Sequence, residues 1–311
     1  MLLTHGAPSA DLPPVALTIG NFDGVHLGHQ AMLAQVVMEA RRRRLMSCVL
    51  SFEPHPREFF SPQSAPTRLA SLREKCELLG SNGIERLHVQ RFTRRFAAMS
   101  PESFVGEYLG RGLKARWLLI GDDFRFGAKR AGDAAMLREL AARHQIEVAA
   151  MPSVTRAGQR VSSSAVRQAL QAGDLATAEA LLGRPYSITG RVVHGDKLGR
   201  ELGFATANLQ LRHNRPPLTG IYAVRVHGAA EAALPGVASL GVRPTVTSSG
   251  RAVLEVHLFD FSEDLYGRHL RVEFLHKIRD EEKYSDLETL RAQIARDCEA
   301  AKAFLMENGN V

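Results

Sequence analysis

The chain has 311 residues, of which 45% are hydrophobic and 23% charged, and its formal net charge is +7 at pH 7. This length predicts two domains, the apolar runs are too short for a membrane span, and no secretory signal is expected. Three widely spaced cysteines argue against a Cys-x-x-Cys zinc site and for reduced thiols. We therefore expect a globular cytoplasmic protein whose partner is anionic, either nucleic acid or a phosphorylated small molecule.

An apolar run at residues 15–19 predicts a buried strand, and the segment Gly-Asn-Phe-Asp-Gly-Val-His-Leu-Gly-His at 20–29 leads from it into a helix. Free N–H groups at the helix start, beside glycines, make an anion site. His26 and His29 add donors that can follow charge developing on a phosphate. The structural alternative is a strand-to-helix turn with two surface histidines. The candidate phosphate-binding residues of the turn are Gly20, Asn21, Phe22 and Asp23.

This segment lacks the Gly-Lys-Ser/Thr of a Walker loop and the glycine spacing of a dinucleotide fingerprint. It resembles the His-x-Gly-His signature of the nucleotidyltransferase superfamily, whose members transfer an AMP unit from ATP.

Further strands are expected at residues 47–52, 86–89, 117–120 and 147–151, with helices starting at Ser71, Ser100 and Asp133 between them. Strands that alternate with helices predict a parallel, Rossmann-like sheet covered on both faces. The loops at 20–29, 53–56 and 121–127 each follow a predicted strand. They should therefore converge on the carboxyl edge of the sheet, where ligands bind in such folds.

Three consecutive serines at residues 162–164 precede a helix that we expect to end near Gly173. Ser163 and Ser164, with free backbone N–H groups and the guanidinium of Arg167, would form a second anion site. Two such sites in one sheet domain suit a triphosphate that is cleaved between its α- and β-phosphates. An ordinary serine cap is the structural alternative.

The pattern changes near Gly183, where we expect a boundary between domains at residues 1–183 and 184–311. Short strands then follow one another without helices, which predicts a six-stranded antiparallel barrel. A last helix, starting at a Ser285–Glu288 capping box, should lay an apolar stripe on the barrel. The expected strands are 186–193, 204–211, 221–226, 236–240, 253–261 and 270–275, and the stripe comprises Leu287, Leu290, Ile294, Cys298, Ala301 and Leu305.

The barrel sequence offers three candidate features. A connecting loop with two glycines and two cations, Gly195, Lys197, Gly199 and Arg200, could cradle phosphates, although ordinary hairpins look similar.

Thr206 and Asn208 share one face of an extended segment, which suits a magnesium ion also held by nucleotide phosphates; packing in the barrel wall is the alternative. Glu255 alternates with buried leucine and valine positions, so it faces either solvent or a cleft in which it could act as a base.

In this order, the motifs resemble the bacterial bifunctional riboflavin kinase/FMN adenylyltransferase (FAD synthetase) family over nearly the whole chain. The family usually has proline before Thr-Ala-Asn, where this chain has Ala205, and asparagine where it has Ser239. The motifs that carry the resemblance are residues 20–29, Phe-Glu-Pro-His-Pro at 52–56, Gly-Asp-Asp-Phe-Arg-Phe-Gly at 121–127, Ser-Ser-Ser-Ala-Val-Arg at 162–167, His-Gly-Asp-Lys-Leu-Gly-Arg at 194–200, Thr-Ala-Asn at 206–208, Pro-Leu-Thr-Gly-Ile-Tyr-Ala-Val at 217–224, Gly-Val-Arg-Pro-Thr at 241–245, and Glu-Val-His at 255–257 before Leu-Tyr-Gly at 265–267.

The resemblance implies two reactions with ATP and a divalent metal. In the barrel, riboflavin would become FMN, with Glu255 as base, Thr206 and Asn208 as magnesium ligands, and the 195–200 loop over the phosphates. In the sheet domain, FMN would become FAD, with His26 and His29 at the α-phosphate. Ser163, Ser164 and Arg167 would hold pyrophosphate, and Asp123, Phe124 and Arg125 would belong to the flavin or nucleotide loop.

Two other functions compete. One is an adenylyltransferase for another nucleotide or a pantetheine-type substrate, with the barrel as a binding module, but a passive module does not need a base and metal ligands. The other is a nucleic-acid-binding protein, and the scattered arginines disfavour it. We therefore expect small-molecule substrates and no nucleic-acid or membrane partner.

Overall fold

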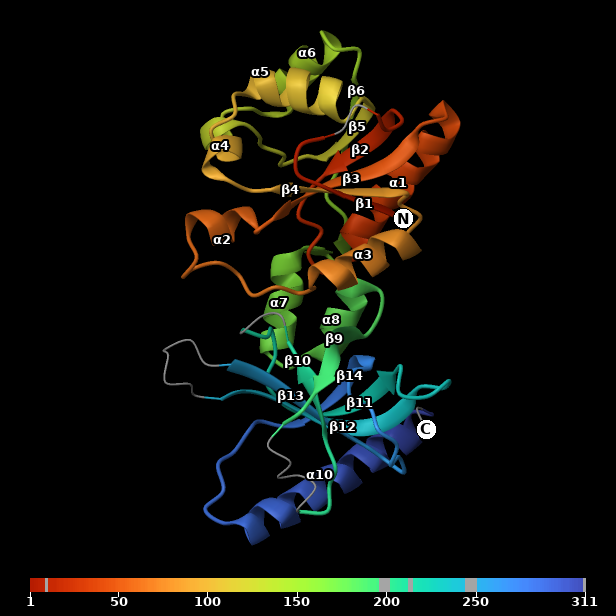
Figure 1. Cartoon of the computed structure of the whole chain (residues 1–311), viewed down its shortest axis with the longest axis vertical. Coiled ribbons are helices and arrows are strands. Elements are labelled where there is room, and N and C mark those ends of the chain that lie inside the picture. Colours follow the sequence, from red (N-terminus) through yellow and green to blue (C-terminus); the bar gives the residue numbers. More distant parts are fainter. Residues whose placement is uncertain (9–10, 196–201, 212–214, 244–250, 310–311) are drawn as a thin grey trace. The chain divides into compact units, whose positions relative to one another are not determined.

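The computed structural model describes residues 1–8, 11–195, 202–211, 215–243 and 251–309. The chain forms two compact units, each with its own core (Figure 1). The first comprises Met1–Pro66 and Leu72–Ser162, and the second comprises Thr67–Ser71 and Ser163–Val311.

The first unit is built on a six-stranded parallel sheet in the order β1-β4-β3-β2-β5-β6. Five of its strands match the predicted ones, and the outer strand β1 was not predicted. The strands are β1 (Leu2–His5), β2 (Val15–Ile19), β3 (Met46–Glu53), β4 (Arg86–Arg91), β5 (Ala115–Gly121) and β6 (Glu147–Met151).

Helices cover both faces of this sheet, as predicted. Alternate strand residues enter two separate apolar cores: Leu17 and Leu118 pack into one, and Ala16 and Leu119 into the other. The helices are α1 (Leu27–Arg43), α2 (Pro56–Phe60), α3 (Leu72–Ser81), α4 (Arg94–Ala97), α5 (Pro101–Ser103), a π-helix (Phe104–Gly112), a 3₁₀ turn (Ala128–Arg130) and α6 (Ala134–Ala142).

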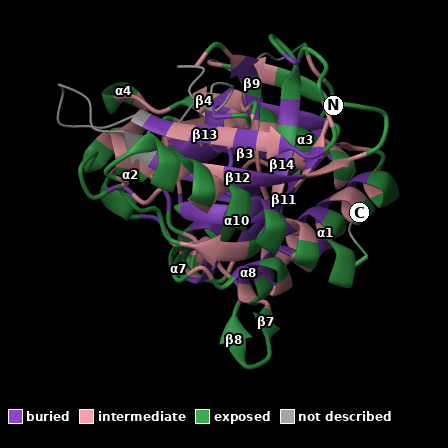
Figure 2. Cartoon of the chain, turned by 90° about the horizontal axis from the view of Figure 1, so that it is seen from below, coloured by how far each residue is buried: buried purple, intermediate pink, exposed green. Residues whose placement is uncertain are grey.

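Several element boundaries differ from the predictions. The helix expected from Ser100 to about Gly110 continues after α5 as a π-helix to Gly112. An exposed hairpin of β7 (Thr155–Arg156) and β8 (Gln159–Arg160) was not predicted (Figure 2). The helix caps were predicted better: Asp133 caps α6 by accepting a hydrogen bond from the Met136 N–H.

The second unit begins with α7 (Ser163–Gln171) and α8 (Leu175–Leu182) and continues as a barrel. Six antiparallel strands close in the order β10-β13-β12-β11-β14-β9, which confirms the predicted barrel (Figure 1). The segment 204–206, expected in the second strand, precedes it. The strands are β9 (Tyr186–Val193), β10 (Ala207–Gln210), β11 (Gly220–His227), β12 (Leu234–Arg243), β13 (Arg251–Leu258) and β14 (His269–Arg279).

The C-terminal helix α10 (Leu287–Glu307) packs its apolar stripe on the outer face of the barrel, as predicted. Leu305 and Ala301 are fully buried against barrel residues such as Val237, but Leu287 is 56% exposed and lies outside this contact.

The expected start of α10 was wrong by one residue. Asp286, in an extended conformation, accepts the Thr289 N–H at 2.7 Å and is the N-cap. Ser285 instead donates its hydroxyl to Asp286. A carboxylate at the cap also favours the positive end of the helix dipole.

A buried ion pair fastens α10 to the barrel. The guanidinium of Arg279, in β14, donates to both carboxylate oxygens of Asp297 at 2.9 and 2.7 Å. Asp297 is 4% exposed and also accepts the Gln293 side-chain amide. The Asp297 carboxylate raises the pKa of Arg279.

Among the described residues, none of the helices combines the length and the apolar character that a membrane span needs.

Replacing Asp297 by alanine should release α10, because it leaves the Arg279 charge partly buried without its partner. We expect a loss of about 3 kcal/mol in the free energy of opening of α10, measured by amide hydrogen exchange in the full chain. The control is Glu299→Ala, because Glu299 is exposed and pairs with Lys302 only at the surface. Its effect should stay below about 0.5 kcal/mol. Equal effects would contradict a structural role for the pair.

Candidate active sites

The first candidate site is the turn between β2 and α1. His26 is the N-cap of α1, and its Nδ1 accepts the His29 backbone N–H at 3.2 Å. The two imidazole rings are stacked, with centroids 3.6 Å apart. Both histidines therefore lie at the helix N-terminus, where the helix dipole favours an anion.

These histidines are not the surface residues of the structural alternative. His26 is 7% exposed, and the His29 Nδ1 is buried without a hydrogen-bond partner among the described residues. Burial lowers the pKa of His29 well below its ordinary value, and the neighbouring His26 and Lys75 lower it further. His29 is therefore neutral at pH 7, and its ring can donate a hydrogen bond without carrying charge.

The turn itself is tightly built. The Phe22 ring is 1% exposed and lies 4.8 Å from the His29 ring, so its side chain supports the turn from inside. A Cβ at Gly20 would lie 3.0 Å from the Phe22 ring, which favours glycine there. The carbonyl of Asn21 accepts the Ser51 hydroxyl at 3.3 Å, and Asp23 is 5% exposed.

The predicted loop at 121–127 follows β5 at the same carboxyl edge of the sheet. Asp123 pairs with Arg160 of β8 at 2.8 Å, and Arg125 lies 3.6 Å from Asp133. Phe124 stacks on Phe126, with centroids 5.8 Å apart. The two charged residues thus form exposed ion pairs, and the ring of Phe124 packs against another aromatic ring.

Sequence reasoning missed a cluster of phenylalanines, which we call the aromatic cluster: Phe52, Phe59, Phe60, Phe92 and Phe96. Their ring centroids lie 5.3–5.8 Å apart in edge-to-face and tilted contacts. Phe60 is 65% exposed, so one side of the cluster is open. The low overall aromatic content hid it, although Phe52 is the penultimate residue of β3 and Phe92 directly follows β4.

The second predicted anion site lies in the second compact unit. Ser163 and Ser164 form the first turn of α7, as expected, with Val166 buried behind them. Arg167 donates its Nε–H to the Thr67 carbonyl of the same unit.

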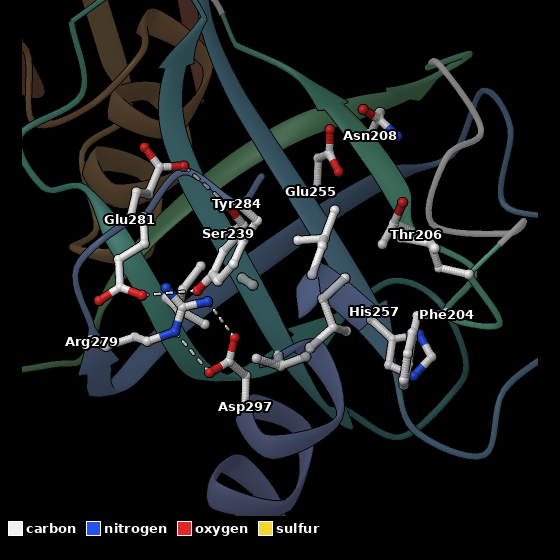
Figure 3. Close-up of a pocket in the computed structure, with 17 residues that line it drawn as sticks. Phe204, Thr206, Asn208, Ser239, Glu255, His257, Arg279, Glu281, Tyr284 and Asp297 are labelled. Carbon is white, nitrogen blue, oxygen red and sulfur yellow. Dashed lines mark hydrogen bonds and ion pairs between the residues drawn. The ribbon is translucent and has the colours of Figure 1, made fainter. Parts of the chain in front are cut away.

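The other candidate site is a cavity of about 220 Å³ on the outer side of the barrel wall, closed by α10 and the segment that precedes it (Figure 3). Apolar residues of the wall and of α10, including Val237 and Ile294, line part of it. Polar groups line the rest. They include Thr206, Asn208, Ser239, Glu255, His257, Arg279, Glu281 and Tyr284.

Strand register places Glu255 at the centre of the polar part. It pairs with Asn208 of β10 on one side and with Ser239 of β12 on the other. Leu254 and Val256, its neighbours along β13, are at most 1% exposed. Glu255 therefore faces a cleft and not open solvent, which were the two possibilities left open by the sequence. Thr206 and Asn208 lie beside it (Figure 3).

This side-chain set fits a hard divalent cation. A hydroxyl, a carboxamide oxygen and a carboxylate are ligands that Mg²⁺ accepts, and such sites are usually completed by substrate phosphates. In the described part of the chain, no three His, Cys, Asp or Glu residues are grouped in a way that could hold a metal.

The loop after β9 approaches the same residues. A Cβ at Gly195 would lie 2.4 Å from Asn208 Cγ, so any larger residue there would displace the Asn208 side chain. The remaining candidates of this loop, Lys197, Gly199 and Arg200, lie outside the described residues.

Of the two departures from the family pattern, Ser239 lines the cavity, and Ala205 contacts a residue that lines it. The Ala205 carbonyl accepts a hydrogen bond from the His257 ring at 2.8 Å, and this ring lies edge-on to Phe204. The Ser239 hydroxyl donates to Glu281 at 3.3 Å.

A parallel sheet with a histidine pair at a helix N-terminus, joined to a barrel whose cleft places a carboxylate beside a hydroxyl and a carboxamide, is the organisation expected of a two-module, nucleotide-using transferase. Residues 9–165 match the family model of FAD synthetase, and residues 182–305 match that of riboflavin kinase. The chain belongs to the bifunctional riboflavin kinase/FMN adenylyltransferase family. The barrel is thus a kinase module and not a passive binding module.

Similar proteins share this organisation from end to end. The bifunctional riboflavin kinase/FMN adenylyltransferase of Escherichia coli K12 is 47% identical over 300 residues, which are 96% of each chain. That of Pseudomonas fluorescens is 48% identical over 286 residues, 92% of this chain and 91% of its own. A solved structure described as a macrolide-efflux protein from Streptococcus pneumoniae has the same fold, with a TM-score of 0.81, 28% identity, and coverage of 97% of this chain and 99% of its own.

Substituting Gly195 by alanine should impair only the kinase module. The added methyl group would push Asn208 away from Glu255, and we expect riboflavin phosphorylation to fall about tenfold or more, while FMN adenylylation is unchanged. The control is Gly80→Ala, because a Cβ at Gly80 would meet only Met1, at 3.8 Å. Wild-type kinase rates in Gly195→Ala would contradict the contact.

Proposed function

We propose that riboflavin is phosphorylated in the barrel cavity and that FMN is adenylylated at the turn between β2 and α1. The observation that carries this division is the register of Asn208, Glu255 and Ser239 across three neighbouring strands. It brings a base and hard oxygen ligands into one cleft, far along the chain from the histidine pair.

In the barrel, Glu255 accepts the proton of the ribityl hydroxyl as that oxygen attacks the γ-phosphorus of ATP. The bond from the γ-phosphorus to its bridging oxygen breaks, and FMN and ADP result. Thr206 and Asn208 would hold Mg²⁺, which would neutralise phosphate charge. Because such transfer depends mainly on positioning and charge neutralisation, the ligands should matter as much as the base.

The loop after β9 would cover the transferred phosphates in this proposal. Gly195 lies against Asn208 and brings the loop to the metal ligands. Lys197, Gly199 and Arg200 would follow it, and the lysine and the arginine would add positive charge.

In the sheet unit, an oxygen of the FMN phosphate attacks the α-phosphorus of a second ATP. The bond between the α-phosphorus and the α,β-bridging oxygen breaks, so FAD forms and pyrophosphate leaves. His26 and His29 would stabilise charge on the α-phosphate, in a turn shaped by Gly20, Asn21, Phe22 and Asp23. Because FMN supplies the nucleophile, no covalent enzyme intermediate is needed.

Pyrophosphate would be held by Ser163 and Ser164 at the start of α7, with Arg167 one turn further on. The N–H groups of the first turn and the two hydroxyls are suited to an anion, and the guanidinium adds a fixed charge.

The flavin ring would lie on the aromatic cluster. Phe60 offers an open ring beside Phe59 and Phe92, and offset or edge-on contacts suit a flat aromatic substrate. The loop of Asp123, Phe124 and Arg125 would border the flavin or the nucleotide from the end of β5.

We further propose that the functional modules divide at residues 183 and 184 and that the enzyme works in the cytoplasm on small molecules. The two matching family models leave residues 166–181 between them, the segment that holds most of α7 and α8. Cys48, Cys76 and Cys298 are all free, which supports a reducing compartment.

The proposal is tested by a chromatographic time course of the full chain with riboflavin, Mg²⁺ and excess ATP. We expect FMN to rise and then give way to FAD. The Glu255→Gln variant should form no FMN from riboflavin but should still convert supplied FMN to FAD. The substitution removes the base from the barrel cavity and leaves the turn between β2 and α1 unchanged. His29→Ala should accumulate FMN and make little FAD. A folded variant that loses both reactions in parallel would reject separate sites.

A further inference from the structure

Lys75 is a buried lysine that no motif of the sequence marks. It lies on α3, is 3% exposed, and donates its Nζ to the Ser51 hydroxyl at 3.2 Å. It also lies 3.6 Å from the Glu53 carboxylate, which is 25% exposed. Burying an ammonium group costs several kcal/mol that an ion pair only partly offsets, so this charge calls for a role.

A chain of hydrogen bonds leads from Lys75 to the turn. The Ser51 hydroxyl accepts from Lys75 and donates its single proton to the Asn21 carbonyl at 3.3 Å. Ser51 is fully buried, so water does not compete for these bonds. The ammonium group is thereby tied to the backbone that leads into the histidine pair.

Lys75 also acts on His29 through space. Burial lowers the pKa of His29 most, followed by the charges of His26 and of Lys75. Two carboxylates complete the surroundings: Glu53 pairs with Lys75, and Asp23 is 5% exposed within the same turn.

We propose that Lys75 is a positioning residue for adenylyl transfer, which fixes the turn through Ser51 and places a positive charge near His29. This inference rests on the proposed function of the turn. The charge attracts the triphosphate electrostatically but makes no direct contact with it. It also helps to keep the His29 ring neutral, so that the ring N–H can donate a hydrogen bond to the α-phosphate.

A purely structural role is the competing explanation, in which the pair of Lys75 and Glu53 only fastens α3 to β3. That role requires an ion pair or a packed side chain and makes no difference to how FAD formation depends on pH. The positioning role requires the charge itself, so arginine should replace lysine better than methionine does.

The test compares Lys75→Met, Lys75→Arg and Arg73→Met in the full chain, with FMN and ATP as substrates. Arg73 lies on the same helix and is exposed. In Lys75→Met we expect kcat for FAD formation to fall about tenfold or more, and its acidic limb to move to higher pH. The shift follows because removing a neighbouring cation raises the pKa of His29, which must be neutral. Lys75→Arg should retain most activity, and Arg73→Met should match the wild type.

Far-UV circular dichroism and thermal unfolding of the same samples report folding, and NMR titration of the His29 ring reports its pKa directly. Unchanged kcat and pH profile in a folded Lys75→Met would overturn the proposal, as would equal losses in the methionine and arginine variants. If Lys75→Met does not fold, Ser51→Ala should lower kcat, and wild-type kcat there would overturn the link to the turn. Normal FAD formation by His29→Ala would instead reject the proposed function of the turn itself.

Discussion

The side-chain alternation of a β-strand, held in register by a closed hydrogen-bonded ladder, is the constraint on which the candidate site of the barrel depends. Each residue of β13 must face either the barrel interior or its outer surface. Leu254 and Val256 occupy the interior, so Glu255 is forced outward between Asn208 and Ser239. A shift of the strand register by one residue would bury the carboxylate and expose the leucines. The register that keeps the barrel core apolar is therefore also the register that places Glu255 in the cleft.

The outward position would leave Glu255 in open water if nothing covered it. Helix α10 supplies the cover: its apolar stripe buries part of the outer wall, and its ion pair with Arg279 is shielded at one end of the cavity. The cleft is therefore lined by both apolar and polar groups. In a partly dry site, charges interact more strongly than in water, which favours phosphoryl transfer.

The sheet unit positions its candidate polar groups, two histidines, by a different structural element. His26 is buried at a helix N-terminus and His29 lies beside it with its Nδ1 buried, so desolvation lowers the pKa of His29. The surrounding rings and glycines leave little freedom to the turn, which is consistent with a site that must be rigid before the phosphates arrive. The candidate group of one module is thus a carboxylate held in a strand register, and those of the other are imidazoles at a helix cap.

By itself, the sequence determined the parallel sheet, the closed barrel, most element positions and the histidine turn, because strand alternation, helix caps and glycine turns are local signals. Asp286 displaced Ser285 as a cap because both residues can cap a helix and only the backbone path selects between them. Tertiary structure alone decided which face of β13 is the cleft, gathered Phe52, Phe60 and Phe92 into one cluster, and brought Lys75 to Ser51 and His29. Those contacts join residues that are distant in the chain, and they arise only when separate strands and helices pack against one another.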